Sequence, residues 1–172
     1  MIKEKPAVIN TQRLSLKSMS DCDKERAIEL FIHPEVYKTY LIPDFKSEDE
    51  KVALFNKIKN LSLMGSRFVY GVYLDNNLIG FVNEVCTQNG EIELGYVISP
   101  SQKNNGFATE ALSACIKELF NMGYSVVKTG AFECNHASIR VMQKCGMQKI
   151  DYTEDIDYRG KINHCIFYEK RV

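Results

Sequence analysis

The spacing of hydrophobic and polar positions changes several times along the chain, which predicts a mixture of strands and helices. Residues 8–17 alternate apolar and polar positions as a strand does. One helix is predicted to begin at Asp21, and a second at the capping box of Ser47 and Glu50, with its end at Gly65. Three runs rich in β-branched and aromatic residues then predict strands, at 68–74, 78–86 and 92–98. The short polar turns between these runs favour antiparallel hairpins.

The second half of the chain alternates helical and strand patterns. It predicts a helix at 108–122, a strand at 126–132, a helix at 136–145 that ends before Gly146, and strands at 147–157 and 162–170. A strand–helix–strand crossover brings its two strands together in parallel. We therefore expect the strands at 92–98 and 126–132 to be parallel neighbours in a mixed α/β fold. The length of 172 residues predicts one domain spanning residues 1–172.

Composition and charge argue against several classes of protein. The 22 Lys and Arg residues balance the 22 Asp and Glu residues, and no basic run occurs, so neither nucleic acid nor a membrane surface is an expected partner. The N-terminal residues lack the apolar stretch of a secretory signal. Six cysteines without a C-x-x-C pair and three scattered histidines predict free thiols, a cytoplasmic location and no metal site.

A polar loop before the helix at 108–122 carries the first chemical signal. The loop reads Lys-Asn-Asn-Gly-Phe-Ala over residues 103–108. The first turn of a helix has unpaired N–H groups and a partial positive charge, which favour phosphate oxygens. Gly106 allows the backbone to approach such a group closely, and Ala108 keeps the neighbouring side chain small. An ordinary solvated turn has the same residue types, so the loop alone leaves both interpretations open.

Three motifs in one order give a more specific signal. They are Glu-Leu-Gly-Tyr-Val-Ile-Ser-Pro from residue 93, Lys-x-x-Gly-x-Ala-Thr-Glu-Ala from residue 103, and Asn-x-x-Ser-x-x-Val-x-x-Lys-x-Gly-Met from residue 135. Over residues 10–168 the chain resembles the GNAT superfamily of acyl-CoA-dependent N-acyltransferases, most closely the ribosomal-protein-alanine N-acetyltransferases (the RimJ/RimL-like branch). The resemblance implies a mixed, mostly antiparallel central sheet of about seven strands with four helices, whose splayed central strands form the acyl-CoA cleft.

The resemblance also implies acetyl-CoA as the acyl donor. The loop would wrap the coenzyme A pyrophosphate with the backbone amides of Lys103, Asn104, Asn105, Gly106, Phe107 and Ala108. The pantetheine arm would pair with the splayed strand at Tyr96, Val97 and Ile98. Such pairing is physically reasonable because the arm and the strand each carry free amide groups. Asn135 would contact the cofactor arm or the acceptor, and it is also a good N-cap for the following helix. Lys103 and Asn104 depart from the Gln or Arg and the glycine that are usual at these positions.

Two side chains are candidates for the chemistry. An amine acceptor arrives as an ammonium ion and must lose a proton, and Glu93 is the expected general base, with Glu84 as the reserve candidate. The alternative for Glu93 is a surface carboxylate. The usual tyrosine acid is Met142 here, so Ser138 is the expected donor to the leaving thiolate, unless it only packs its helix. The resemblance implies that a backbone N–H, of Val97 or Ile98, stabilises the oxyanion.

The predicted reaction is acetyl transfer to a primary amine, by direct attack in a ternary complex. The acceptor is a protein N-terminus or a small molecule; the alternatives are an amino acid, a polyamine, an aminoglycoside, or a coenzyme A-binding module without activity. A cationic acceptor favours an acidic cleft, to which Asp44, Glu48, Asp49 and Glu50 can contribute, although the same group suits a helix N-terminus. The motifs specify neither the acceptor nor the length of the acyl group. A homodimer is expected only from the resemblance to the family.

Overall fold

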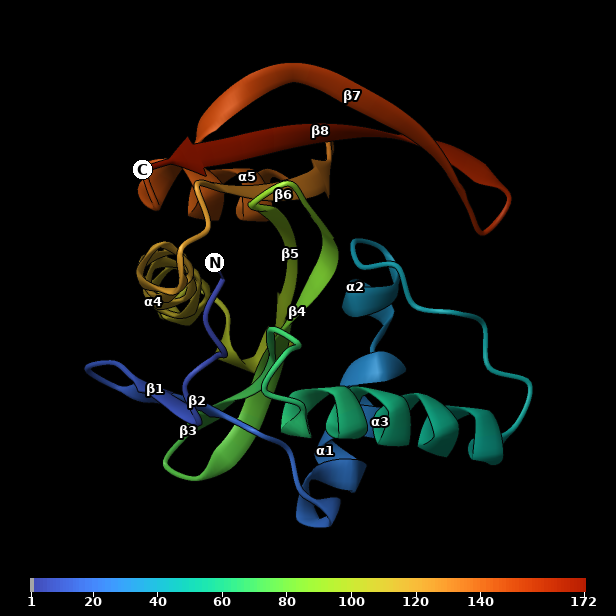
Figure 1. The fold of residues 1–172 in the computed structure, drawn as a ribbon. Helices are drawn as coiled ribbons and strands as arrows, with labels where there is room; N and C mark the ends of the chain where they lie inside the picture. Colours follow the sequence, from blue (N-terminus) through green and yellow to red (C-terminus); the bar gives the residue numbers. More distant parts are fainter. Residues whose placement is uncertain (1) are drawn as a thin grey trace.

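The computed structural model describes residues 2–172, and a single sheet organises them (Figure 1). Its eight strands are joined in the order β1-β2-β3-β4-β5-β6-β8-β7. The strands are β1 (Val8–Asn10), β2 (Leu14–Lys17), β3 (Val69–Leu74), β4 (Asn77–Gln88), β5 (Glu91–Ile98), β6 (Val126–Phe132), β7 (Gln148–Tyr158) and β8 (Lys161–Arg171). The α-helices are α1 (Lys24–Phe31), α2 (Pro34–Tyr37), α3 (Glu48–Leu63), α4 (Phe107–Met122) and α5 (His136–Lys144).

The predicted mixed, mostly antiparallel sheet is confirmed. Every neighbouring pair is antiparallel except β5 and β6, which are parallel as the crossover through α4 predicts. The expected count was about seven strands and four helices, and the described chain has eight strands and five α-helices. The extra strand arises because the predicted strand at 8–17 is broken by a turn, in which the N–H of Thr11 donates to the carbonyl of Leu14 at 2.9 Å. The extra helix is α2, a single turn that starts at Pro34.

Helices cover both faces of the sheet (Figure 1). The larger core lies on one face, where α4 packs against the sheet with α5 beside it. A second core lies on the other face, under α1 and α3. The hairpin of β7 and β8 extends past this second face toward α2. The sheet thus separates two layers of helices, and the parallel strands β5 and β6 lie side by side within it.

Two helix starts show how local chemistry sets the boundaries. The predicted start at Asp21 was wrong for the α-helix, because α1 begins at Lys24 with Asp23 as its N-cap. Residues Asp21–Asp23 form a short 3-10 turn capped by Ser20, whose N–H donates to the carboxylate of Asp23 at 2.8 Å. The start of α3 is as predicted, because Ser47 Oγ accepts from the N–H of Glu50 at 3.3 Å. The reciprocal bond differs, since Glu50 accepts from the N–H of Lys46 at 2.6 Å.

The parallel strands β5 and β6 pair over only three residues. Glu91, Ile92 and Glu93 are opposite residues 126–128, and beyond that point β6 continues its pairing with β8 alone. This parting leaves the second half of β5 without a neighbour on one side. All six cysteines are free thiols, as predicted. Within residues 2–172, no helix combines the length and the apolar character needed to cross a membrane.

Candidate active site

A cavity of about 370 Å³ opens where β5 and β6 part. It is bounded by the second half of β5, the loop before α4, the middle of β6 and the first turns of α5. Most of the predicted site residues line it: Tyr96, Val97, Ile98, Lys103, Asn104, Gly106, Phe107, Ala108, Asn135 and Ser138. Two predicted residues, Asn105 and Glu93, are outside this lining. The sequence therefore predicts one coherent site from segments that are up to 42 residues apart.

The backbone of β5 presents its free polar groups to the cavity. The N–H of Ser99 donates to the carbonyl of Ile79 at 2.7 Å, so Ser99 faces the neighbouring strand β4. In an antiparallel pair, alternate residues direct both backbone groups to the same neighbour. Val97 therefore also faces β4, whereas Tyr96 and Ile98 direct their N–H and C=O groups into the gap. Of the two predicted oxyanion donors, Ile98 has the accessible N–H.

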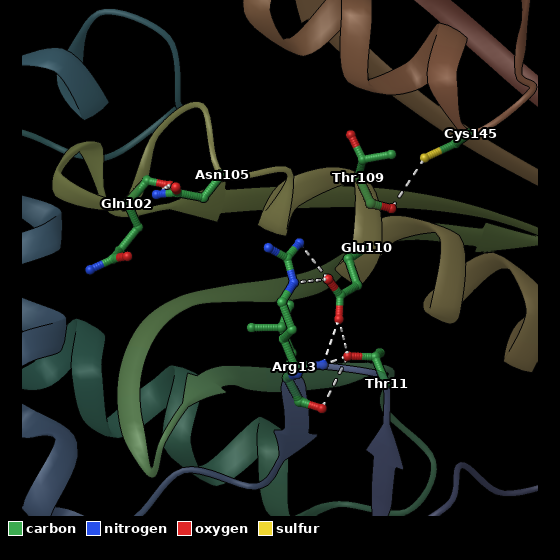
Figure 2. Close-up of polar contacts among 8 residues, drawn as sticks. Thr11, Arg13, Gln102, Asn105, Thr109, Glu110 and Cys145 are labelled. Atoms are coloured by element: carbon green, nitrogen blue, oxygen red, sulfur yellow. Dashed lines mark hydrogen bonds and ion pairs between the residues drawn. The ribbon is translucent and has the colours of Figure 1, made fainter.

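The loop before α4 has the backbone geometry of an anion site. Asn104 and Gly106 have φ angles of +64° and +80°, in the left-handed region that Asn and Gly tolerate. Asn105 stabilises the loop from within, because its side-chain amide donates to the carbonyls of Gln102 and Lys103, each at 3.3 Å (Figure 2). The N–H of Glu110 is the first to bond back into the helix, to Gly106 at 3.0 Å. The N–H groups of the preceding turn are thus left for a ligand.

Three cations line the same cavity. Lys103 forms an ion pair with Glu35 at the start of α2. Arg140 and Lys144 are exposed and lie one helical turn apart on α5. Lys144 is a position of the third motif, whereas the motifs do not single out Arg140; the available signal for Arg140 was its i,i+4 spacing from Lys144. Guanidinium and ammonium groups beside unpaired helix N–H groups suit a polyanion such as a nucleotide diphosphate.

Asn135 and Ser138 are coupled at the start of α5. The Oδ1 atom of Asn135 accepts from the N–H of Ser138 at 3.2 Å, so Asn135 is the N-cap that the sequence predicts. The Oγ atom of Ser138 lies 2.6 Å from the hydroxyl of Tyr96 on β5. Met142, one turn further along α5, is completely buried in the core. The hydroxyl groups at this end of the cavity therefore belong to Tyr96 and Ser138.

Glu93 lies two residues before Gly95, which lines the cavity. Its side chain is part-buried and makes no hydrogen bond or ion pair within residues 2–172. Burial raises the pKa of Glu93, and the charge of Glu154 on β7 raises it further, whereas Lys128 opposes the shift. A free carboxylate with a raised pKa is suited to accept a proton near neutral pH.

The reserve candidate, Glu84, has a structural role instead. Its carboxylate accepts from the N–H of Phe68 at 2.7 Å and forms an ion pair with Arg67 at 2.6 Å. The side chain is only 6% exposed. These contacts occupy the carboxylate and leave Glu93 as the free acid on these two strands.

Tyr40 and Asn83 close the cavity on the side of α2. The hydroxyl of Tyr40 donates to Oδ1 of Asn83, and its ring packs edge-on against Phe81 at 5.6 Å between centroids. A Cβ atom on Gly95 would lie 2.9 Å from the Tyr40 hydroxyl and 3.1 Å from Asn83 Oδ1. A side chain at position 95 would therefore force the ends of the Tyr40 and Asn83 side chains to shift. Tyr40 therefore both lines the cavity and packs against Phe81.

The tip of the β7–β8 hairpin is fastened to the segment after α2. The hydroxyl of Tyr158 lies 3.1 Å from the carbonyl oxygens of Tyr40 and Ile42. Arg159 lies over the ring of Tyr37 at 3.9 Å and pairs with Asp44 at 2.5 Å. Local partners also engage other members of the acidic group at 44–50, since Lys51 pairs with Glu48 at 2.7 Å. Asp44, Glu48 and Glu50 of this group therefore have local partners in the hairpin and at the start of α3.

A mixed sheet whose central strands part beside a helix start with unpaired N–H groups is the arrangement that the resemblance to the acetyltransferases implies. The chain belongs to the acetyltransferase (GNAT) domain family, whose model matches residues 13–148. This confirms the family and the N-acetyltransferase class that the motifs predict.

Named relatives agree with this assignment. An uncharacterized N-acetyltransferase of Bacillus subtilis, YoaA, is 27% identical over 147 residues, which cover 83% of each chain. The fold is shared with RimL, a ribosomal L7/L12 alpha-N-protein acetyltransferase solved with coenzyme A, at a TM-score of 0.82 and 15% identity over 96% of this chain and 98% of that one. It is equally shared with MccE, a microcin C7 self-immunity acetyltransferase solved with acetyl-CoA and AMP, at a TM-score of 0.82 and 15% identity over 99% of both chains.

Proposed function

We propose that this protein transfers an acetyl group from acetyl-CoA to a primary amine, in a ternary complex without a covalent enzyme intermediate. One observation carries the proposal: free strand amides, unpaired helix N–H groups and the hydroxyl of Ser138 all line one cavity. This arrangement matches a long donor that has phosphates at one end and a thioester at the other.

Different residues of the cavity would bind different parts of such a donor. The first-turn N–H groups of Phe107 and Ala108 would bind the pyrophosphate, with Lys103 and the α5 cations as counter-charges. The outward backbone groups of Tyr96 and Ile98 would pair with the two amides of the pantetheine arm. Acetyl-CoA itself supplies an activated acyl carbon and a good leaving thiolate.

The chemistry then needs a base, an oxyanion donor and a group that faces the sulfur. Glu93 would take the proton of the incoming ammonium ion, through a water molecule because it is two residues, about 7 Å along the strand, from the cavity wall. The nitrogen–carbon bond forms and the carbon–sulfur bond breaks, with the N–H of Ile98 directed at the carbonyl oxygen. Ser138 would donate to the departing sulfur.

The acceptor is a protein N-terminus or a small-molecule amine. RimL is named for a protein N-terminus and MccE for microcin self-immunity, so neighbours with this fold support both classes equally. A polyamine or an aminoglycoside has less support, because the acidic group at 44–50 is engaged in local contacts. A coenzyme A-binding module without transfer would need the same cavity but not the free carboxylate of Glu93.

Calorimetric titration with acetyl-CoA, followed by thiol release from a panel of amines, tests the proposal. We expect micromolar binding and acceptor-dependent release of thiol. Gly106→Val should weaken binding, because φ is +80° at this position and a branched side chain resists that conformation. Gly160→Val, in the hairpin turn at φ +71°, is a matched strained control away from the loop. Absence of acetyl-CoA binding by the folded wild type would refute the function.

A further inference from the structure

The hydroxyl groups of Tyr96 and Ser138 meet at the inner end of the cavity. The Oη atom of Tyr96 lies 2.6 Å from Ser138 Oγ and 3.3 Å from the carbonyl oxygen of the same residue. Both residues line the cavity. Two side chains from different elements thus form one pair of hydroxyl groups at the place where a thioester would lie.

Strand and helix geometry both fix this pair. Tyr96 and the buried Leu94 share the face of β5 that packs against the core beneath α4. This face directs the ring of Tyr96 toward α5. On the other side, the N-cap bond from Asn135 holds Ser138 in the first turn of α5. Neither residue needs to move for the contact to form.

The distances around Tyr96 Oη decide the direction of the hydrogen bond, because Ser138 Oγ at 2.6 Å is a closer acceptor for the phenol proton than the Ser138 carbonyl oxygen at 3.3 Å. Burial raises the pKa of Tyr96 well above its ordinary value of 10.0, so the phenol keeps its proton throughout the neutral range. The phenol has one proton to donate, and Ser138 Oγ is its nearest acceptor. When Oγ accepts this bond, the proton of the serine is left for a third group in the cavity.

Met142, the residue one turn beyond Ser138 on α5, cannot replace Ser138 as a proton donor to the sulfur. It lies one turn after Ser138, is completely buried, and carries no proton to donate. Among residues 2–172, no other side chain is within hydrogen-bond distance of Ser138 Oγ. The orientation of the serine proton therefore depends on Tyr96.

We propose that Tyr96 is a positioning residue that directs the hydroxyl proton of Ser138 toward the sulfur of coenzyme A. The inference rests on the proposed function. As the carbon–sulfur bond breaks, its electron pair passes to the sulfur, and the serine O–H stabilises the resulting thiolate. The ammonium ion gives one proton to Glu93 before it attacks, and the second proton of the nitrogen passes to the thiolate as the intermediate collapses, so that coenzyme A leaves as the thiol. Tyr96 gives up no proton in the cycle.

The test measures the thiol pKa of bound coenzyme A, from the pH dependence of the thiolate ultraviolet absorbance after subtraction of the protein alone. The wild type should lower this pKa relative to free coenzyme A, and both Tyr96→Phe and Ser138→Ala should raise it toward the free value. Tyr96→Phe should have no further effect in the Ser138→Ala background. In turnover, Tyr96→Phe should lower kcat about fivefold, the loss of one net hydrogen bond, with the Kd for coenzyme A unchanged.

Tyr124→Phe is the matched control, because Tyr124 is part-buried against the same core but does not line the cavity. It should leave the thiol pKa and kcat unchanged. An unaltered thiol pKa in Tyr96→Phe that still binds coenzyme A would overturn the inference and leave the proposed function standing. Weaker binding of coenzyme A with unchanged kcat would also overturn it, in favour of a packing role. Failure of the wild type to bind coenzyme A would overturn both.

Discussion

Glu110 in the first turn of α4 forms an ion pair with Arg13 in the turn between β1 and β2, at 2.7 Å between Oε2 and Nη2 (Figure 2). The same carboxylate accepts from the backbone N–H of Arg13 at 2.9 Å and from the hydroxyl of Thr11 at 2.6 Å. Arg13 also lies over the ring of Phe107, 4.5 Å from its centroid. These contacts join the edge of the sheet to the first turn of α4, next to the loop at residues 103–108.

We expect Glu110→Gln to destabilise the protein and to weaken acetyl-CoA binding. The change weakens several charge-assisted hydrogen bonds, and we expect a loss of about 1–2 kcal/mol, at the modest end because Arg13 is 42% exposed. Chemical denaturation and calorimetry measure the two effects. Glu118→Gln, at a half-buried position two turns further along α4, is the control, since the one hydrogen bond of its carboxylate within residues 2–172 is a 3.4 Å bond from Asn121. Equal stability of the two variants would contradict this role for Glu110.

The contribution of Glu110 should also depend on pH. Burial alone would raise its pKa, but hydrogen bonds from Thr11 and Arg13 outweigh burial and lower the pKa below the ordinary value of 4.5. A carboxyl group whose folded pKa is lowered stabilises the protein above its unfolded pKa, and this stabilisation is lost as the pH falls through the folded pKa. The difference in stability between wild type and Glu110→Gln should therefore shrink below about pH 4.5.

The raised pKa of Glu93 predicts the acidic limb of the activity profile. A general base must be deprotonated, so kcat/KM should fall as the pH drops through an apparent pKa above the ordinary 4.5. Glu93→Gln should lower kcat about 10²-fold and remove this limb, with acetyl-CoA binding nearly unchanged. If kcat/KM of this variant still falls at acidic pH with the same apparent pKa, a group other than Glu93 is the general base.

A second variant tests the cause of the shift. The charge of Glu154 raises the pKa of Glu93, so Glu154→Gln should lower that pKa and extend activity to lower pH. Asp155→Asn is the control, because the neighbouring side chain pairs with His164 at 2.8 Å and does not perturb Glu93. If both variants shift the apparent pKa of the acidic limb equally, that pKa depends on the net charge of the protein and not on the nearby carboxylate of Glu154.

The two exposed cations of α5 should contribute to donor affinity. Arg140→Gln and Lys144→Gln should each weaken acetyl-CoA binding by about fivefold at low salt, since a unit charge pair at about 4 Å in water is worth roughly 1 kcal/mol. The effect should diminish as added salt screens the charges. Lys149→Gln, an exposed lysine on β7 outside the cavity, should leave the affinity unchanged. Losses that persist at high salt would indicate a packing role.

The sequence predicts those parts of the structure that follow from local pattern. Strand β6 has the predicted bounds, and the chain crosses over through α4 to a parallel strand, because β-branched runs and helical spacing are local properties. The conformation of the loop at 103–108 is likewise local, since Gly106 and Asn104 adopt left-handed backbone conformations within one turn. The exact cap of the first helix is not predicted, because a 3-10 turn at Asp21–Asp23 precedes α1 and makes Asp23 the cap of the α-helix.

Contacts between distant segments could not be predicted in the same way. Strand periodicity indicates that Tyr96 shares a face with Leu94, but not that α5 places Ser138 above it. Equally, nothing in the segment around Tyr40 indicates that its hydroxyl would meet Asn83. Both contacts depend on how layers pack, and packing joins residues that the chain pattern treats separately.

The tip of the β7–β8 hairpin supports the last prediction, because Arg159 has two opposed roles there. Its φ of +56°, followed by Gly160 at +71°, places it in a turn that favours Asn or Gly at both central positions. Its guanidinium, however, stacks on Tyr37 and pairs with Asp44, which fastens the hairpin to the segment that carries Tyr40. The turn thus accepts an unfavourable residue in exchange for a contact beside the cavity.

Arg159→Asn separates these two roles. Asn suits the turn and removes the guanidinium, so the free energy of unfolding should change by less than about 1 kcal/mol, as favourable turn chemistry offsets the lost exposed cation–π contact and ion pair. The KM for the amine acceptor should rise several-fold, because the wall that contains Tyr40 loses its fastening, while the Kd for acetyl-CoA stays unchanged. Lys161→Asn, in the same hairpin without a side-chain partner, is the control. Steady-state kinetics in both substrates make the measurement, and an unchanged acceptor KM in Arg159→Asn would show that the hairpin tip does not shape the acceptor side.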